Sequence, residues 1–169
     1  MQTQETCKNE KMEPEFELDT VDKRILAALQ QQGRATYDEL ASTVGLSASA
    51  TLRRVKRLEE AGVIAGYAAL VEPERVGLAL TAYINVRLAK ASAAGNPTEA
   101  FAAAVLAWPE VVECVALSGE MDYLLRVLVR DMAHYSRFVM DTLLRHPAVQ
   151  DCKTSFLMRR LKGTTAVPL

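Results

Sequence analysis

The chain has 169 residues, of which 50% are hydrophobic and 24% are charged, and its formal net charge is −1. This balance is typical of a globular protein with one or two small domains, and no apolar run approaches the roughly 18 residues that cross a bilayer. The N-terminus shows no signal-peptide pattern, so we expect a cytoplasmic protein without a membrane span, and any affinity for nucleic acid must come from a local patch.

The first 72 residues are predicted to hold a flexible arm and three short helices. Residues 1–17 are polar and acidic without periodicity, which is typical of a flexible arm. Helices are expected over about 19–32, 37–44 and 48–61, with Asp19, Thr36 and Ser47 as N-caps and Gly33, Gly45 and Gly62 at the ends. Because a tight glycine-containing turn joins the last two, residues 18–72 are predicted to be a helix-turn-helix domain, with a wing-like strand or hairpin over 63–71.

The second half is predicted to be a duplicated strand–helix–strand unit over residues 79–169, after a linker at 73–78. Strands are expected at about 78–88, 111–118, 123–130 and 149–160, and helices after Asn96 and over 132–146. Proline, valine, an acidic residue and cysteine recur with the same spacing in 109–114 and 147–152. The β-α-β-β-α-β order predicts a ferredoxin-like α+β domain, a fold that by itself says little about function.

The third predicted helix carries a local basic patch. From Ser47 to Arg57 there are four cations and no acidic residue. A helical wheel of about 100° per residue separates two faces. The core face is Ala48, Thr51, Val55 and Leu58; the opposite face is Ser49, Ala50, Arg53, Lys56, Arg57 and Glu60, with Arg54 on the flank. A charge run alone is usually a solvated face, but in the second helix of a helix-turn-helix it favours DNA binding.

The position along this helix predicts what each side chain contacts. N-terminal residues of such a helix meet base edges, so Ser49, Ala50 and Arg53 are assigned to the major groove. The Arg53 guanidinium is able to bind guanine through two hydrogen bonds. The expected phosphate contacts are Lys56 and Arg57 through their charge, Arg54 unless it is an intramolecular brace, and Thr36 and Ser47 through free backbone N–H groups at helix starts.

The same residues form a family pattern. In the N-terminal half they are Leu18, Asp19, Asp22, Ile25, Gly33, Arg34, Glu39, Val44, Ser47, Arg54, Leu58, Gly62, Gly66 and Tyr67. In the C-terminal half they are Gly119, Asp122, Tyr123, Thr154, Ser155, Phe156, Lys162 and Pro168. In this order and spacing, the chain from about residue 18 to 169 resembles the leucine-responsive/asparagine regulator (Lrp/AsnC) family of transcription regulators.

The resemblance implies a winged helix-turn-helix joined to a ferredoxin-like sensor domain. In the family, sensor domains pair through their sheets into homodimers, and the dimers associate further, often into octamers. Amino-acid effectors bind between dimers, near the turn that is 119–122 in this chain. Carried over position by position, the effector candidates are Ser118, Gly119, Met121, Asp122 and Tyr123, with Thr154 and Ser155 as weaker ones.

The effector candidates suit a zwitterionic ligand. Asp122 is able to accept from an α-ammonium group, and turn N–H groups with a hydroxyl are able to hold the carboxylate. The apolar residues Met121 and Leu124 favour an aliphatic or sulfur-containing amino acid. The alternative is that glycine followed by an aspartate in a hairpin is simply turn chemistry, and the spacing alone leaves it open.

Other functional classes have weak support. The three cysteines, Cys7, Cys114 and Cys152, show no CxxC spacing, and the two histidines belong to no nucleophile or metal motif. We therefore expect no catalytic residue, no metal and no cofactor. The predicted function is a sequence-specific, double-stranded-DNA-binding regulator of amino-acid metabolism. The alternative is an architectural DNA organiser with little sequence preference and no effector.

Overall fold

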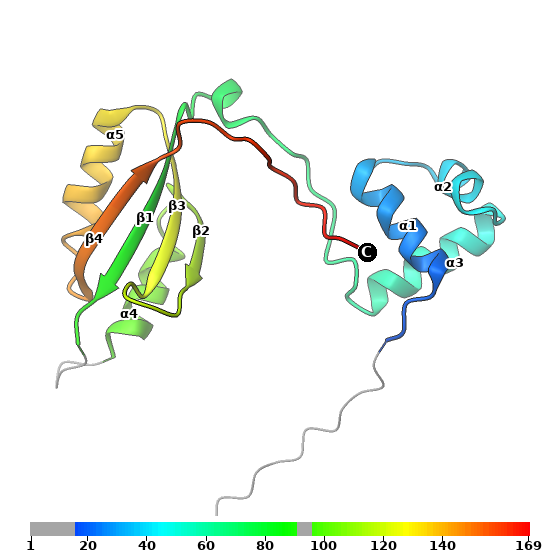
Figure 1. The fold of residues 1–169 in the computed structure, drawn as a ribbon, viewed down its shortest axis with the longest axis horizontal. Helices are drawn as coiled ribbons and strands as arrows, with labels where there is room; N and C mark the ends of the chain where they lie inside the picture. Colours follow the sequence, from blue (N-terminus) through cyan, green and yellow to red (C-terminus); the bar gives the residue numbers. More distant parts are fainter. Residues whose placement is uncertain (1–15, 91–95) are drawn as a thin grey trace, which may run out of the picture. The chain divides into compact units, whose positions relative to one another are not determined.

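The computed structural model describes residues 16–90 and 96–169, which form two compact units. One unit contains the described residues through Ala69 together with Thr164–Leu169, and the other is Leu70–Gly163. Figure 1 shows the helical unit and the sheet-containing unit, each with its elements labelled. The first 15 residues of the expected arm, Cys7 among them, and loop residues 91–95 lie outside the described residues.

The first unit is a three-helix domain whose helices begin and end as the sequence predicts. It contains α1 (Thr20–Gln31), α2 (Tyr37–Val44) and α3 (Ala48–Glu60). Asp19, Thr36 and Ser47 each accept a backbone N–H with the side chain at the N-cap. Gly45 ends α2 with φ of 75°, a left-handed conformation that glycine adopts without steric cost. The helix-turn-helix is therefore confirmed.

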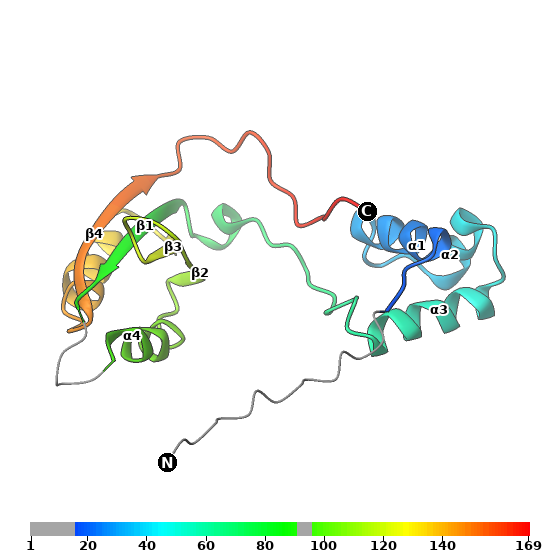
Figure 2. The same ribbon diagram turned by 60° about the horizontal axis from the view of Figure 1, so that its bottom comes forward.

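The core of this unit is one apolar cluster shared by the three helices. Its buried members are Ile25, Leu26, Leu40, Val44, Val55 and Leu58. In Figure 2, α3 lies below α1 and α2. The C-terminal tail also contacts α1, because the Gln30 amide donates to the Val167 carbonyl (3.1 Å) and accepts from the Val167 N–H (2.5 Å).

The expected strand or hairpin over 63–71 is wrong: the structure contains no strand in that range. Its start is tied to α3, since the Ile64 amide donates to the Leu58 carbonyl and the Tyr67 hydroxyl donates to Glu59 (2.9 Å). Beyond it, Leu70 is exposed, and the chain enters the 3₁₀ turn η1 (Pro73–Val76). An apolar run makes a strand only where a second strand supplies hydrogen-bond partners, and this segment pairs with no described strand.

The second unit is a four-stranded antiparallel sheet with helices, in ferredoxin-like order. Its elements are β1 (Leu80–Leu88), α4 (Pro97–Val105), β2 (Val111–Ala116), β3 (Tyr123–Val129), α5 (Met132–Arg137), the π-helical η2 (Phe138–Leu143) and β4 (Val149–Phe156). The strand order is β2-β3-β1-β4. The predicted β-α-β-β-α-β fold class is therefore confirmed, and the last helix continues α5 through η2.

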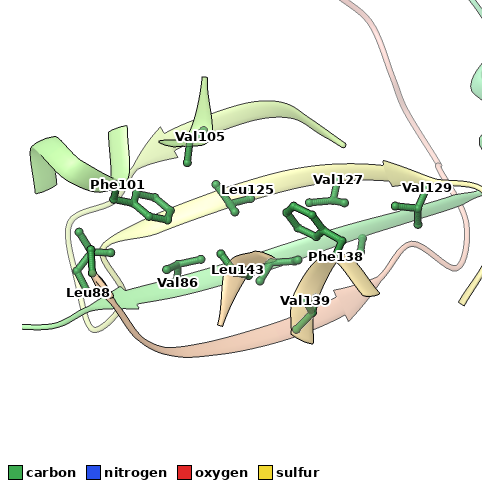
Figure 3. Packing of buried hydrophobic residues seen from close by; sticks show 13 residues of the cluster. Val86, Leu88, Phe101, Val105, Leu125, Val127, Val129, Phe138, Val139 and Leu143 are labelled. Atoms are coloured by element: carbon green, nitrogen blue, oxygen red, sulfur yellow. The ribbon is translucent and has the colours of Figure 1, made fainter. Parts of the chain in front are cut away.

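One face of the sheet packs against both helices. Figure 3 shows Phe101 and Val105 from α4, and Phe138, Val139 and Leu143 from the last helix, meeting residues of β1 and β3. The buried strand residues alternate along the sequence: Ala82, Ile84, Val86 and Leu88 on β1, and Leu125, Val127 and Val129 on β3. The intervening residues lie on the other face, which no helix of this unit covers.

The strand ends differ from those predicted for a reason visible in the pairing. The strand expected to reach residue 160 stops at Phe156, which pairs with Ala82 near the start of β1. The next residue, Leu157, still donates its N–H to the Thr81 carbonyl (3.0 Å), and β1 begins one residue before Thr81, at Leu80. In the same way β2 stops at Ala116, paired with Tyr123 at the first position of β3.

Candidate functional site

Helix α3 buries one face and exposes the other. Ser47 stabilises its start, because the hydroxyl oxygen accepts from the Ala50 N–H at 3.3 Å. Thr51, Val55 and Leu58 are buried, whereas Ala48 and Ala50 are half-buried. The exposed residues of the helix are Ser49, Arg53, Lys56, Arg57, Glu59 and Glu60. The face predicted to meet DNA is therefore open to solvent in this unit.

Two of the four cations of α3 are paired with carboxylates at the start of α1. Arg54 Nη1 lies 2.6 Å from Asp19 Oδ2 and 2.8 Å from Asp22 Oδ1. Arg57 Nη2 donates to the other oxygen of Asp22, whose side chain is fully buried. Arg54 thus forms an intramolecular brace, one of the two roles that the sequence left open, and Arg57 is engaged in the same way.

The remaining two cations of the helix, Arg53 and Lys56, are exposed. No ion pair involves either of them within residues 16–90 and 96–169. Because no carboxylate neutralises them, they provide the local positive charge that the sequence predicts for this surface.

The two helix starts assigned to phosphate differ in charge. At α2 the Thr36 N–H donates to Glu39 Oε2 (2.7 Å), and the Glu39 N–H donates to the Thr36 hydroxyl oxygen (3.3 Å). The bond from the Thr36 N–H, followed by that from its hydroxyl, lowers the pKa of Glu39, so this helix start already holds an anion. At α3 the first turn contains no acidic residue. The geometry is favourable for a phosphate at Ser47 and unfavourable at Thr36.

Two residues to which the sequence analysis gave no role in packing hold the three helices together. The Arg24 guanidinium donates to the Thr43 carbonyl (2.5 Å) and the Val44 carbonyl (3.5 Å) at the end of α2. These are last-turn carbonyls without intrahelical partners, which cations stabilise. Asp22 completes a capping box with Asp19 and binds both arginines of α3. The position of Asp22 at N3 of α1 predicts its capping role. Its arginine partners could not be predicted in this way, because they lie more than thirty residues later in the sequence.

The turn between β2 and β3 carries four of the predicted effector residues. Ser118, Gly119 and Asp122 are exposed and Met121 is half-buried. Gly119 has φ of 143°, within the range that favours glycine. The Asp122 N–H donates to the Val86 carbonyl (2.9 Å), and one Asp122 carboxylate oxygen accepts from the Leu88 N–H (2.7 Å). Asp122 therefore fixes the turn to the end of β1, as the turn-chemistry alternative expects.

Charged residues that the sequence did not identify surround this turn. Arg87 Nη2 donates to Glu120 Oε1 (2.7 Å), and Lys153 Nζ lies 3.5 Å from the same oxygen. The positive charge of Lys153, followed by the hydrogen bond from Arg87, lowers the pKa of Glu120. The Arg87 Nε atom is buried and has no hydrogen-bond partner in this unit. The turn thus carries both signs of charge.

The other three effector candidates, Tyr123, Thr154 and Ser155, do not form one continuous surface with the turn. The Tyr123 ring packs against Phe101 in the core (centroids 5.1 Å apart). Thr154 pairs with Ile84 on the helix-covered face, and its hydroxyl accepts from the Tyr135 hydroxyl (2.7 Å). Ser155, the next residue, lies on the open face opposite Tyr83. Neighbours on a strand point to opposite faces, so Thr154 and Ser155 do not line one face together.

Both histidines have structural partners. His134 Nε2 lies 3.0 Å from Glu110 Oε1, and His146 Nδ1 accepts from the Ala148 N–H at 3.3 Å. Within the part of the chain that the structure describes, no group of three or more His, Cys, Asp and Glu side chains is arranged to hold a metal. In the same residues, no helix is long and apolar enough to cross a membrane.

Comparisons with known proteins match both units in order. A family model described as the Lrp/AsnC ligand binding domain matches residues 81–167, and one described as winged helix-turn-helix DNA-binding matches residues 18–65. The leucine-responsive regulatory protein of Haemophilus influenzae is 42% identical over 154 residues, 90% of each chain. The Bkd operon transcriptional regulator of Pseudomonas aeruginosa is 39% identical over 153 residues, 90% of this chain and 99% of the relative.

A solved structure agrees with these matches. The transcriptional regulator of Neisseria meningitidis in complex with L-methionine is 49% identical, with a TM-score of 0.86, and the match covers 90% of this chain and 97% of that one. Family models, relatives and structure thus agree over both units. The chain belongs to the Lrp/AsnC family of transcription regulators.

Proposed function

We propose that this chain is a sequence-specific DNA-binding regulator of amino-acid metabolism whose promoter occupancy is tuned by a small amino-acid effector. One observation carries the DNA-binding part. A well-packed helix-turn-helix exposes Arg53 and Lys56 on α3, and neither has a carboxylate partner among the described residues. In this motif the N-terminal part of the second helix enters the major groove.

The contacts follow from the position of each residue on α3. Ser49, Ala50 and Arg53 face the base edges, and Arg53 supplies the two-hydrogen-bond contact to guanine. Lys56, one turn further along, binds a phosphate, and the backbone N–H groups after Ser47 bind another.

Arg53→Ala and Lys56→Ala are expected to weaken DNA binding in different ways. Loss of Arg53 should cost about 1–3 kcal/mol on a specific promoter duplex and little on random DNA. Loss of Lys56 should weaken binding to both duplexes by the same factor. It should also reduce the slope of log K against log salt by about 0.9. Fluorescence anisotropy of labelled duplexes over a salt series measures both effects.

Glu60→Ala, on the same exposed face, provides the control and should not reduce affinity. Equal losses for Arg53→Ala and Lys56→Ala on both duplexes would contradict the division into base and phosphate contacts. If the unmodified protein shows no preference for promoter over random DNA, it is an architectural organiser.

The open face of the sheet supports a homodimer. Val115 and Leu124 are directly paired across β2 and β3 on that face, and Tyr83 lies there on β1. Leu124 and Tyr83 are half-buried and Val115 is exposed in the single chain. A second copy seated on this face would bury them and give a dimer that carries two helix-turn-helix units. Further association of dimers, to an octamer as the family resemblance implies, would complete the effector sites.

The effector proposed for the turn at residues 117–122 is an amino acid with an apolar side chain, with methionine as the first candidate. Support comes from the half-buried Met121 and from the related Neisseria regulator, which was solved with L-methionine. One oxygen of Asp122 accepts from the Leu88 N–H, and the second, which bonds no described side chain, would accept from an α-ammonium group. Arg87, beside the turn, supplies a cation for the carboxylate.

Titration with each of the twenty amino acids should identify the effector. Methionine or an aliphatic amino acid is expected to shift the anisotropy curve for promoter DNA, whereas acidic amino acids should not. Asp122→Asn keeps the acceptor for the Leu88 N–H but removes the charge, so it should weaken effector binding about tenfold or more and leave DNA affinity unchanged. No shift with any amino acid, in the presence of specific DNA binding, would contradict the effector proposal.

A further inference from the structure

We propose that Arg54 and Arg57 are positioning residues that brace α3 against Asp19 and Asp22 and contact no phosphate. Under this assignment, Arg53 and Lys56 are the two cations of α3 that contact DNA. The inference rests on the proposed DNA binding, and it replaces the assignment of Arg57 to a phosphate.

The inference rests on the hydrogen-bond donors that already occupy both oxygens of the Asp22 carboxylate. Asp22 has no exposed surface. Its Oδ1 accepts from Arg54 at 2.8 Å, and its Oδ2 accepts from Arg57 and from the Asp19 N–H at 3.2 Å. If Arg57 turned toward a phosphate, Oδ2 would keep only the Asp19 N–H. A buried carboxylate that loses a charged partner is strongly destabilising, so the phosphate would have to compete against this cost.

A second contact holds Arg57 in the same place. The carbon at the centre of its guanidinium lies 5.0 Å from the centroid of the Phe16 ring, within the range of a cation–π interaction. Phe16 also packs against the apolar cluster of the helix-turn-helix. Arg57 is therefore held by a buried anion and by an aromatic ring at the start of the domain.

Arg54 is held from two sides. It bonds Asp19 at 2.6 Å and Asp22 at 2.8 Å, and these bonds raise its pKa. Together, two carboxylates and two guanidinium groups form a cluster of zero net charge. Of the four cations on α3, only the two outside this cluster add net positive charge to the DNA-facing surface.

The cluster also orients the helix. Arg54 and Arg57 are three residues apart and lie on one flank of α3, where they meet the first turn of α1. The capping box that begins α1 is thus the same group that fixes the rotation of α3 about its axis. This rotation turns Ser49, Arg53 and Lys56 outward together.

Adjacent variants on α3 test the inference. Arg57→Met and Lys56→Met each remove one positive charge from neighbouring exposed positions. On one promoter duplex over a salt series, Lys56→Met should reduce the slope of log K against log salt by about 0.9, and Arg57→Met should leave the slope unchanged. A reduction for Arg57→Met equal to that for Lys56→Met would overturn the inference.

A second variant covers the case in which Arg57→Met fails to fold. Asp22→Asn combined with Arg57→Met removes the pair without changing the net charge. Its affinity for the promoter duplex should stay within about threefold of the unmodified protein, with the same slope. If this double variant folds but shows a reduced slope, the inference is wrong while the proposed function stands. No salt-dependent DNA binding by the unmodified protein would overturn the proposed function and the inference together.

Discussion

Asp22→Ala is expected to lower the free energy of unfolding of the helix-turn-helix unit by about 2–4 kcal/mol. The substitution leaves the guanidinium groups of Arg54 and Arg57 without their shared buried acceptor. It also removes the carboxylate that accepts the Asp19 N–H at the start of α1. The loss comes from the capping bond and the charge-assisted hydrogen bonds that the carboxylate makes, since the Arg54 and Arg57 side chains are 30% and 49% exposed and remain in contact with solvent.

Chemical denaturation followed by far-UV circular dichroism measures this loss. Asp38→Ala is the matched control, because Asp38 is an exposed acid in the first turn of α2 and should contribute less than about 1 kcal/mol. The single tryptophan, Trp108, belongs to the second unit, so its fluorescence transition should not move. A loss for Asp22→Ala no larger than that for Asp38→Ala would show that the buried carboxylate is not what holds α3.

Phe101→Ala is expected to destabilise the second unit by about 3–5 kcal/mol. Phe101 is fully buried between α4 and the sheet, as Figure 3 shows. Its ring packs against three others, with centroids 5.8 Å from Trp108, 5.1 Å from Tyr123 and 6.1 Å from His146. Alanine would leave a cavity among rings that are held by the sheet and by two helices, so the site has little freedom to collapse.

Trp108 provides the probe for this variant because its ring contacts Phe101. The midpoint of the Trp108 fluorescence transition should fall to lower denaturant at one fixed protomer concentration. Leu106→Ala, at the end of the same helix, removes a side chain that is 91% exposed and should change stability by no more than about 0.5 kcal/mol. Similar shifts for the two variants would contradict the packing role of Phe101.

The elements of the helix-turn-helix could be predicted because their signals are local. Each N-cap side chain binds an N–H two or three residues later, and Gly45 follows directly after α2. Of the core face predicted for α3, the structure buries Thr51, Val55 and Leu58, and Ala48 is half-buried. The strand predicted over 63–71 was wrong because an apolar run is also a local signal, whereas strand formation depends on a partner that the sequence does not specify.

The effector candidates fall on different surfaces of the second unit for a similar reason. The candidates Ser118, Gly119, Met121 and Asp122, which the family resemblance implies, lie together on one turn because they are near neighbours in the sequence. Thr154 and Ser155 are also consecutive, but strand pairing sends one to the helices and the other to the open face. Arg87 and Glu120 meet beside the turn although 33 residues separate them, and no spacing rule brings them together.

The helix-turn-helix, the ferredoxin-like order of the second unit and the basic face of α3 could all be predicted from the sequence. These features follow from caps, periodicity and charge within a few residues of each other. Which of the four cations on α3 are neutralised depends on how the helices pack. The partners of Arg54 and Arg57 lie 32 to 35 residues earlier, on α1. A charge pattern describes one helix, but the burial of Asp22 that engages two of those charges arises only when α1 and α3 pack.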